Sequence, residues 1–553
     1  MRNASAGLPG VGREPQQADW PLPWISRLAA FVAGALVVMC ANASEPDVRD
    51  TRVQELQFAF DEAFERYRPP GLAVGIIVDG EVVFTATRGE LAAGGGQPVD
   101  RDTLFQIASN SKAMTAAVLA RLVDQGKLAW TDPVVRHLPD FRMYDDWVTR
   151  EMQVRDLLIH NSGLGAGAGD LMLWPGPNRF SRQDVIHGLR HLKPVYSFRS
   201  RYAYDNTLYI VAGEVAAAAG GAPFDRLLRR ELFEPLGLRR CQAGRWLRDE
   251  VGNIAQPHAG GADGHRVAHA DPEIVEDLPM LAAGGIRCSL DDMLRWAAMW
   301  LQPERHGLDA GGRPFLSATQ REEAWKTHMP MPLTTRMREW DNSHFSAYGY
   351  GWRLTDVDGT WKVSHTGTLS GMYSSLTLLP EKGVGIVILA NGEMDELRTV
   401  LGQVLVKRFT RPADATLTVA HYAGLLAATA PAADNAATAA DAGPRKPAPA
   451  SDAQVPTGRY RDSWFGEVAL CPNGEGIEFR ALKSPRLAGA LHYSGERLLV
   501  DWHDPGVDAE AWVHFDQRDD GTRMTLAKVD PAADFSYDYE DLAFERTGNC
   551  DAP

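Results

Sequence analysis

The pattern of apolar and polar residues predicts both strands and helices in the larger part of the chain. Residues 72–78 and 81–87 are rich in β-branched side chains and flank Asp79-Gly80, a two-residue turn typical of a β-hairpin. Residues 374–379 and 384–390 predict a second hairpin near the end of this part. Since helical patterns lie between the two hairpins, we expect an α+β architecture in which the first and last strands of an antiparallel sheet meet.

Two segments between the hairpins have the apolar spacing of helices. Residues 113–124 place Met114 and Val118 on one helical face, and Gly126 follows at a position that suits a helix C-cap. Residues 208–215 are almost entirely apolar and predict a buried helix. Each of these helices directly follows a short polar motif.

The last hundred residues have a different pattern. Short alternating runs lie between turn clusters such as Pro472-Asn473-Gly474, which predicts a small all-β barrel or sandwich. These runs cover residues 467–470, 477–480, 498–502, 511–515 and 524–529. Upstream, residues 427–455 are rich in Ala and Pro and contain no aromatic residue, which is typical of a linker. A short alanine helix is the alternative for part of that stretch.

The N-terminus predicts an export signal. Three Arg residues precede an uncharged apolar stretch, residues 28–41, which is shorter than the ~20 residues that span a bilayer. A small-x-small sequence ends at Ala43, where we expect a signal peptide to be cleaved. A buried core helix is one alternative, and lipidation at Cys40 is another, although Met39 is bulkier than the residue that normally precedes a lipidated Cys. We expect a secreted or periplasmic protein that meets a membrane only through its signal peptide.

Composition narrows the possible chemistry. The chain has 57 Lys and Arg against 72 Asp and Glu, a formal net charge of −15, and no basic block. Nucleic acid is therefore not an expected partner, because binding a polyphosphate needs clustered cations. The G-x-S-x-G, H-E-x-x-H and P-loop motifs are missing from the sequence, as are C-x-x-C pairs. We expect neither a metal ion nor a cofactor.

The motif Ser109-Asn110-Ser111-Lys112 opens the first predicted helix. Ser109 and Lys112 are three residues apart, so their side chains lie on the same helical face. A Lys in a partly desolvated cleft can lose its proton and then activate a serine hydroxyl. The Ser109 backbone N–H at the helix start is a candidate oxyanion donor. Alone, the motif also fits a Ser cap followed by a solvated Lys.

Two further motifs follow in the chain, Tyr204-Asp205-Asn206 before the buried helix and His365-Thr366-Gly367 before the last hairpin. The order S-x-x-K, Y-x-N and [K/H]-T-G resembles that of the penicillin-recognising serine hydrolases of the class C β-lactamase family. This family includes DD-peptidases, D-aminopeptidases and esterases. Supporting stretches lie at residues 70–75, 154–164, 283–286 and 348–352.

The resemblance implies a fold and a role for each motif residue. The fold would be an antiparallel sheet flanked by helices, with an all-helical subdomain. Ser109 would be the acylated nucleophile and Lys112 its proton acceptor, while Tyr204 would relay a proton to the leaving group. Asn206 would bind the substrate carbonyl. Substrate would also contact the strand that carries His365, Thr366, Gly367 and Thr368, and the Thr368 backbone N–H would complete the oxyanion hole.

His365 departs from the pattern of β-lactamases and DD-peptidases, which usually carry Lys at this position. A His with its ordinary pKa of about 6.5 is mostly neutral at pH 7, so it holds a substrate carboxylate less firmly. We therefore expect a serine hydrolase that acts on ester, amide or D-amino-acid peptide bonds of a small molecule or peptide, including cell-wall-derived ones. A true β-lactamase or DD-peptidase is one alternative, and a non-catalytic binding or scaffold protein is another.

The C-terminal region resembles the small lipocalin-like β domain that is often appended to these hydrolases, on residues 457–466, 487–492 and 502–504. Its aromatic residues form either a barrel core or a ligand groove. The expected organisation is a signal peptide at 1–43, a hydrolase domain at 44–410, a linker at 411–455 and a β-barrel at 456–548. Four Cys remain after cleavage, and of three possible connectivities we favour one pair per domain. These pairs are Cys241 with Cys288 and Cys471 with Cys550.

Overall fold

The computed structural model describes residues 48–429 and 445–550, apart from residues 261–263, 269, 310, 370, 508 and 520. The expected signal peptide lies outside these residues, and so does the middle of the expected linker. The part of the chain that begins at Val48 forms one compact unit.

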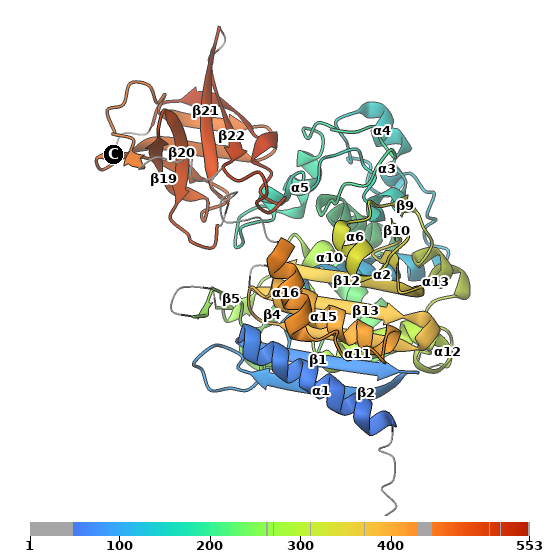
Figure 1. Cartoon of the computed structure of the whole chain (residues 1–553). Coiled ribbons are helices and arrows are strands. Elements are labelled where there is room, and N and C mark those ends of the chain that lie inside the picture. The colour runs from blue at the N-terminus through green and yellow to red at the C-terminus, as the bar shows by residue number, and fades with distance from the viewer. Residues whose placement is uncertain are drawn as a thin grey trace, which may run out of the picture. The chain divides into compact units, whose positions relative to one another are not determined.

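A mixed N-terminal domain is built on an antiparallel sheet, which has eight strands within the described residues (Figure 1). Its strand order is β2-β1-β14-β13-β12-β11-β10-β9. The first strand pairs with the last, with Leu72 opposite Ala390, which confirms the expected closure of the sheet. The strands are β1 (Gly71–Val78), β2 (Glu81–Gly89), β9 (Met329–Pro330), β10 (Ser346–Tyr348), β11 (Arg353–Val357), β12 (Thr360–Leu369), β13 (Met372–Leu379) and β14 (Val384–Ala390).

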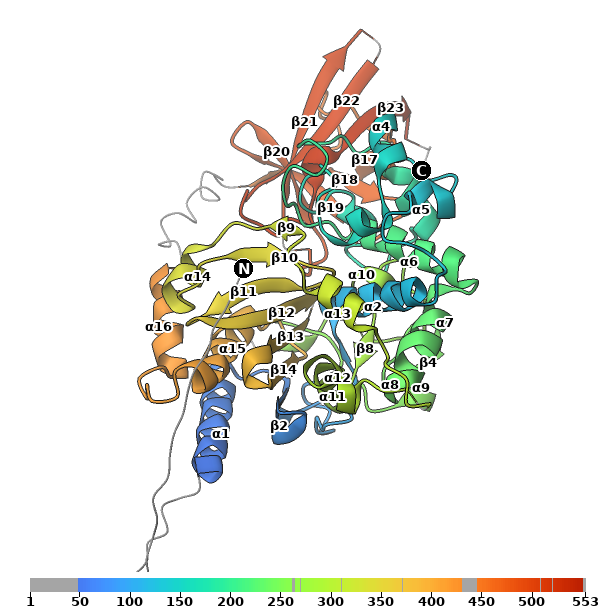
Figure 2. The ribbon, with the colours of Figure 1, turned by 90° about the vertical axis from the view of Figure 1, so that its right-hand side faces the viewer.

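Helices cover both faces of this sheet (Figure 2). Strand side chains alternate between the faces, so Val74 and Ile76 belong to one core and Ala73 and Ile77 to the other. The first core is covered by α1 (Val48–Tyr67), α15 (Asp395–Thr410) and α16 (Val419–Thr429). The second core is covered by α2 (Ser111–Asp124), α6 (Thr207–Gly220) and α11 (Leu290–Leu301).

Short elements fill the connections of this domain, and most lie between the strands β3 and β8. No single helix in the described part of the chain is long and apolar enough to cross a membrane, although Thr207–Gly220 and Phe224–Leu236, bent at 75°, together have that length and composition. The short elements are β3 (Phe105–Gln106), η1 (Ala108–Asn110), α3 (Val134–His137), α4 (Asp146–Glu151), η2 (Val154–Leu158), η3 (Asp170–Met172), α5 (Arg182–Gly188), α7 (Phe224–Leu228), η4 (Arg229–Phe233), α8 (Glu234–Leu236), β4 (Trp246–Leu247), α9 (Arg248–Val251), β5 (His258–Ala259), β6 (Arg266–Val267), β7 (Ile274–Val275), α10 (Leu281–Gly284), β8 (Arg287–Cys288), α12 (Pro303–His306), α13 (Ala318–Ala324), α14 (Thr335–Trp340) and η5 (Pro380–Lys382).

The chain does not leave the N-terminal domain at residue 410. Helix α16 occupies part of the stretch from 411 to 455 that we expected to be a linker, and it packs against α15 and α1. Val419, Tyr422 and Ala423 are buried in this contact. They bury the apolar surface that a tether lacks, so the linker prediction was wrong for this part. Residues 430–444 lie outside the described residues.

The C-terminal domain is an antiparallel barrel with eight strands in the described part of the chain. A pairing between β19 and β20 closes it, and β15 adds to β19 at the rim. Phe479, Trp502 and Phe544 are buried inside, so these aromatic residues form a barrel core. The elements are β15 (Lys446–Pro447), β16 (Gly458–Asp462), β17 (Gly466–Asn473), β18 (Gly476–Ala481), β19 (Ala488–Ser494), β20 (Arg497–Trp502), β21 (Ala511–Arg518), β22 (Gly521–Lys528), η7 (Tyr539–Asp541) and β23 (Ala543–Gly548).

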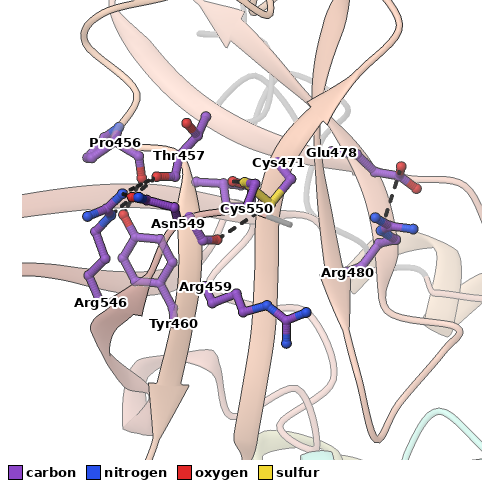
Figure 3. The surroundings of a disulfide bond; sticks show 12 residues. Pro456, Thr457, Arg459, Tyr460, Cys471, Glu478, Arg480, Arg546, Asn549 and Cys550 are labelled. Carbon is purple, nitrogen blue, oxygen red and sulfur yellow. Dashed lines mark hydrogen bonds and ion pairs between the residues drawn. A yellow bond between two sulfur atoms is a disulfide. The ribbon is translucent and has the colours of Figure 1, made fainter. Parts of the chain in front are cut away.

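The structure contains both of the disulfides that we favoured from the sequence, Cys241–Cys288 and Cys471–Cys550. The second joins β17 to the segment that follows β23, beside the hydrogen bonds from Arg546 to the Thr457 carbonyl (Figure 3). It therefore secures the C-terminal end of the barrel.

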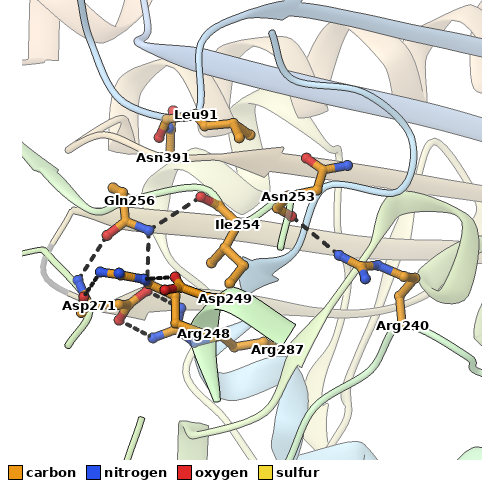
Figure 4. Close-up of polar contacts among 10 residues, drawn as sticks. All are labelled: Leu91, Arg240, Arg248, Asp249, Asn253, Ile254, Gln256, Asp271, Arg287 and Asn391. Carbon is orange, nitrogen blue, oxygen red and sulfur yellow. Dashed lines mark hydrogen bonds and ion pairs between the residues drawn. The ribbon is translucent and has the colours of Figure 1, made fainter. Parts of the chain in front are cut away.

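A buried ion pair lies next to the first disulfide. The Arg287 guanidinium donates two hydrogen bonds of 2.6 Å to the Asp271 carboxylate, and Gln256 bonds to Asp271 as well (Figure 4). Arg287 belongs to β8, whose partner strand β3 leads directly into the S-x-x-K motif. The disulfide and the ion pair thus support the frame on which that motif rests.

Candidate active site

Ser109 lies where β3 turns into helix α2. The preceding residue, Ala108, has a φ of 50°, in the left-handed region that L-residues seldom adopt. Such a conformation persists only where the surroundings enforce it. Ser374 contributes by donating a hydrogen bond of 2.7 Å to the Ile107 carbonyl. The strained turn places Ser109 immediately before the helix, as expected for a nucleophile held at a helix N-terminus.

Lys112 is fully buried beneath Ser109. Its Nζ lies 3.3 Å from Ser109 Oγ and donates to Asn206 Oδ1 at 2.7 Å and to the Ala283 carbonyl at 2.8 Å. Burial lowers the pKa of Lys112 to about 7, although the carboxylate of Asp170 acts in the opposite direction. Such a Lys is substantially uncharged at neutral pH and can accept the Ser109 proton.

Tyr204 completes the immediate surroundings of Ser109, to which its side chain is hydrogen-bonded. Lys112 Nζ lies 4.8 Å from the centre of the Tyr204 ring. Burial raises the pKa of Tyr204 to about 12, and the hydrogen bond with Ser109 offsets this only in part. Tyr204 therefore keeps its proton at neutral pH and can pass it to a leaving group.

Asn206 is buried between Lys112 and a residue that we missed in the sequence, Asp170. Asn206 Nδ2 donates to Asp170 Oδ2 at 2.8 Å, and its Oδ1 accepts from Lys112. Only the second hydrogen on Nδ2 remains to bind a substrate carbonyl. The structure thus shows Asn206 chiefly as the residue that positions Lys112.

Asp170 follows the Gly-rich run of residues 163–169 at the start of η3. Its side chain is fully buried, and burial raises the pKa of Asp170 well above its usual range, against the effect of the Asn206 hydrogen bond. A lone Asp after a Gly-rich run is a weak sequence signal. The contact with Asn206 depends on tertiary packing, so no local pattern could have identified it.

His365 lies on β12 but does not face solvent, since only 1% of it is exposed. Its Nδ1 lies 2.7 Å from the Thr366 carbonyl, which can only accept, so Nε2 accepts from the Tyr348 hydroxyl at 2.8 Å. Burial, with the charges of Arg353 and Lys112, lowers the pKa of His365 well below its usual range. His365 is therefore a neutral residue, and its ring centre lies 6.4 Å from that of Tyr204.

The other motif residues of β12, Thr366 to Thr368, lie on the part of the strand that contacts η1. A Cβ at Gly367 would lie 2.2 Å from the Ile107 carbonyl oxygen, so only Gly allows this close approach. Thr368 is exposed at the end of the strand, and Thr366 Oγ1 accepts a hydrogen bond from Arg353. The structure thus brings β12 against the turn that carries Ser109.

Arg353 is the second residue that sequence reasoning missed. It lies on β11 opposite Ser364 of β12, and its Nη1 is 3.2 Å from Thr366 Oγ1. Arg398 of α15 also reaches this strand and donates to the Gly367 carbonyl at 2.7 Å. The strand next to the H-T-G strand thus supplies a fixed positive charge that His365 does not.

Within the residues described, no group of three or more His, Cys, Asp or Glu side chains is placed to hold a metal ion. The side chains of the site offer a hydroxyl, a buried amine, a phenol and two guanidinium groups.

This chain is similar to several known proteins. Residues 56–406 match the model of the Beta-lactamase family. The chain is 29% identical over 361 residues to penicillin-binding protein 4 of Amycolatopsis lactamdurans, covering 63% of this chain and 89% of that protein. It is 27% identical over 369 residues to the esterase EstB of Burkholderia gladioli, covering 61% and 89%. The octameric penicillin-binding protein homologue from Pyrococcus abyssi shares the fold at 18% identity, with a TM-score of 0.54, covering 89% of this chain and 99% of that one.

Proposed function

Since the chain belongs to the Beta-lactamase family and is a serine hydrolase of that family, we propose that it cleaves ester, amide or D-amino-acid peptide bonds through an acyl-Ser109 intermediate. One observation carries the proposal: Lys112 Nζ lies 3.3 Å from Ser109 Oγ, and burial lowers the Lys112 pKa to about 7. The amine is therefore within reach of the hydroxyl proton and able to take it.

Acylation follows from the positions of three side chains. Lys112 accepts the Ser109 proton while Oγ attacks the substrate carbonyl carbon. The negative charge on the carbonyl oxygen is stabilised by the backbone N–H groups of Ser109 and Thr368, and removing one such donor typically costs about 10²–10³ in rate. The bond to the leaving group breaks as Tyr204 donates its proton to the leaving oxygen or nitrogen. Lys112 then returns a proton to Tyr204.

Deacylation uses the same groups in reverse. Water attacks the acyl-Ser109 carbonyl, and its proton passes to the neutral Lys112 amine. The ester bond to Ser109 breaks, the Oγ regains a proton, and the carboxylic acid product leaves. The substrate is a small molecule or a peptide, and cell-wall-derived peptides carry bonds of the required kind.

Because His365 is buried and neutral, it offers no charge to a substrate carboxylate, and this favours substrates that lack one. A second support is that a similar chain is named an esterase. A second candidate is a β-lactamase or DD-peptidase activity, which Arg353 favours because it places a guanidinium beside Thr366. The test is a panel of p-nitrophenyl esters, D-amino-acid anilides, nitrocefin and acyl-D-Ala-D-Ala. We expect esters or D-aminoacyl substrates to give the highest kcat/KM, and a nitrocefin rate well above both would favour the second candidate.

The hydrolase proposal itself is tested by a fluorescent fluorophosphonate. Wild-type protein is expected to bind the probe covalently, whereas Ser109→Ala is expected to stay unlabelled. Equal labelling of both proteins would overturn the assignment of Ser109.

A further inference from the structure

A loop of the C-terminal barrel contacts the candidate active site. This segment, residues 529–542 between β22 and β23, is called the barrel loop below. Both carboxylate oxygens of its Asp538 accept backbone N–H groups of the N-terminal domain, from Gly169 at 2.6 Å and from Leu171 at 3.0 Å. Asp538 is 5% exposed. These bonds attach the barrel loop to the segment that presents Asp170.

Two neighbouring residues of the barrel loop reach side chains of the candidate active site, Tyr204 and Asp170. The Phe535 ring lies edge-on to Tyr204, with 5.7 Å between ring centres and an interplanar angle of 75°. Ser536 Oγ donates a hydrogen bond of 3.0 Å to Asp170 Oδ2, the same oxygen that accepts from Asn206. The loop therefore borders both Tyr204 and the Asp170–Asn206 pair.

The Gly-rich run of the N-terminal domain is shaped to receive this loop. Gly167 has a φ of 76°, and a Cβ there would lie 2.5 Å from the Phe535 carbonyl oxygen. Any larger residue at this position would push the barrel loop away, and it would also strain the backbone. The backbone N–H of Gly167 donates to the Tyr204 carbonyl at 2.8 Å, so the run joins the loop to the catalytic Tyr.

Other contacts hold the barrel at the same edge of the N-terminal domain. Lys483 forms an ion pair of 2.6 Å with Asp184, and Arg486 donates to the Gly176 carbonyl at 2.5 Å. The rings of Phe180 and Phe465 pack with 5.5 Å between their centres. The position of Phe535 thus depends on several independent contacts.

Phe535 nevertheless remains 41% exposed. An aromatic ring that is held beside a catalytic Tyr and still open to solvent offers apolar surface to whatever binds there. The acyl carbon that bonds to Ser109 Oγ lies beside Tyr204, because the side chains of Ser109 and Tyr204 are neighbours. An acyl chain that extends past Tyr204 therefore meets Phe535.

We propose that the barrel loop is a specificity element of the active site, in which Phe535 contacts the substrate and limits the length of the chain that fits beside Tyr204. Short acyl groups are then preferred over long ones. Ser536 and Asp538 are positioning residues that hold Phe535 in place. This inference rests on the proposed acyl-Ser109 chemistry and extends it by giving the C-terminal domain a part in substrate choice.

The test compares p-nitrophenyl acetate, butyrate and octanoate in the full-length protein. Phe535→Ala is expected to raise the ratio of kcat/KM for octanoate over acetate by about tenfold or more, since pocket contacts of this size discriminate by that order. Gly167→Ala changes the N-terminal domain instead, where the added Cβ displaces the barrel loop. It is expected to shift the ratio in the same direction. Phe58→Ala removes an equally large ring, 63% exposed on α1, and should leave the ratio unchanged.

The labelling of Ser109 separates the two proposals. Methyl and decyl fluorophosphonates report on the same chain-length limit even if esters are poor substrates. If neither probe labels wild-type protein, the hydrolase proposal fails. If wild type is labelled at Ser109 but Phe535→Ala changes neither the ester ratio nor the ratio of the two labelling rates, the specificity inference is wrong. Circular dichroism of each variant confirms that it is folded.

Discussion

Asn206 Nδ2 donates a hydrogen bond to Asp170 Oδ2 across 2.8 Å, at a place where both side chains are buried. The other end of the Asn206 amide accepts from Lys112 at 2.7 Å. The three residues form a chain of contacts that directs the Lys112 amine toward Ser109. The base of the proposed reaction is thus positioned by a residue that takes no part in proton transfer.

Replacing Asp170 by Ala is expected to destabilise the protein and to lower kcat together. Asn206 would keep a buried donor without its acceptor, which typically costs about 1–3 kcal/mol. Urea unfolding measures the first effect and steady-state kinetics the second. Asp249→Ala, at a position 72% exposed, is the matched control and should change neither. An Asp170→Ala variant with wild-type stability and kcat would show that the chain of contacts has no role.

The rate of acylation is expected to depend on pH through Lys112. The amine is active only when unprotonated, so the rate rises with pH through an apparent pKa of about 7 and levels off above it. A stopped-flow pH profile of p-nitrophenol release measures this rise of the acylation rate with pH.

Lys112→Arg supplies the matched comparison, because a guanidinium keeps its proton at every accessible pH. The variant is expected to lose at least about a hundredfold in acylation rate. A wild-type profile that stays flat from about pH 5 to 9 contradicts Lys112 as the base.

Arg353 is expected to matter for substrates that carry a carboxylate. Loss of a charge-assisted hydrogen bond costs about 1.5–3 kcal/mol, so Arg353→Gln should raise KM for acyl-D-Ala-D-Ala or nitrocefin by about tenfold or more. KM for p-nitrophenyl acetate, which lacks a carboxylate, should stay within about twofold, since it loses no such bond. Arg313→Gln removes a guanidinium that is 82% exposed and serves as the control. Equal effects of Arg353→Gln on both substrate classes would argue for a purely structural role.

The Cys241–Cys288 disulfide is expected to stabilise the frame behind Ser109. It closes a loop with a sequence separation of 47 residues, for which chain entropy predicts a contribution of about 4 kcal/mol. The double variant Cys241→Ser, Cys288→Ser should therefore unfold at clearly lower urea concentration. An unchanged unfolding midpoint would show that the Arg287–Asp271 ion pair stabilises this frame without help from the disulfide.

Local patterns were enough to predict the hairpin strands β1, β2, β13 and β14. Asp79 and Gly80 both have positive φ values, 52° and 82°, as the two-residue turn requires. The spacing of Ser109 and Lys112 also predicted their contact, because one helical turn determines it.

Other features depend on tertiary structure and could not be predicted in this way. Arg353 meets Thr366 only through the register of β11 and β12, and Asp170 meets Asn206 only through the packing of η3 on α6. Helix α16 has an Ala-rich sequence that fits a linker equally well until α15 covers it. The contact of Phe535 with Tyr204 joins residues more than three hundred positions apart, in two different domains.

The acyl-Ser109 intermediate is tested most directly by quenching the reaction with a slowly hydrolysed p-nitrophenyl ester and mapping the modified peptide by mass spectrometry. We expect the mass of one acyl group to be added to Ser109 in the wild-type protein, whereas Ser109→Ala should gain no such mass. An acyl group found on another residue, or turnover by Ser109→Ala at the wild-type rate, would contradict this expectation.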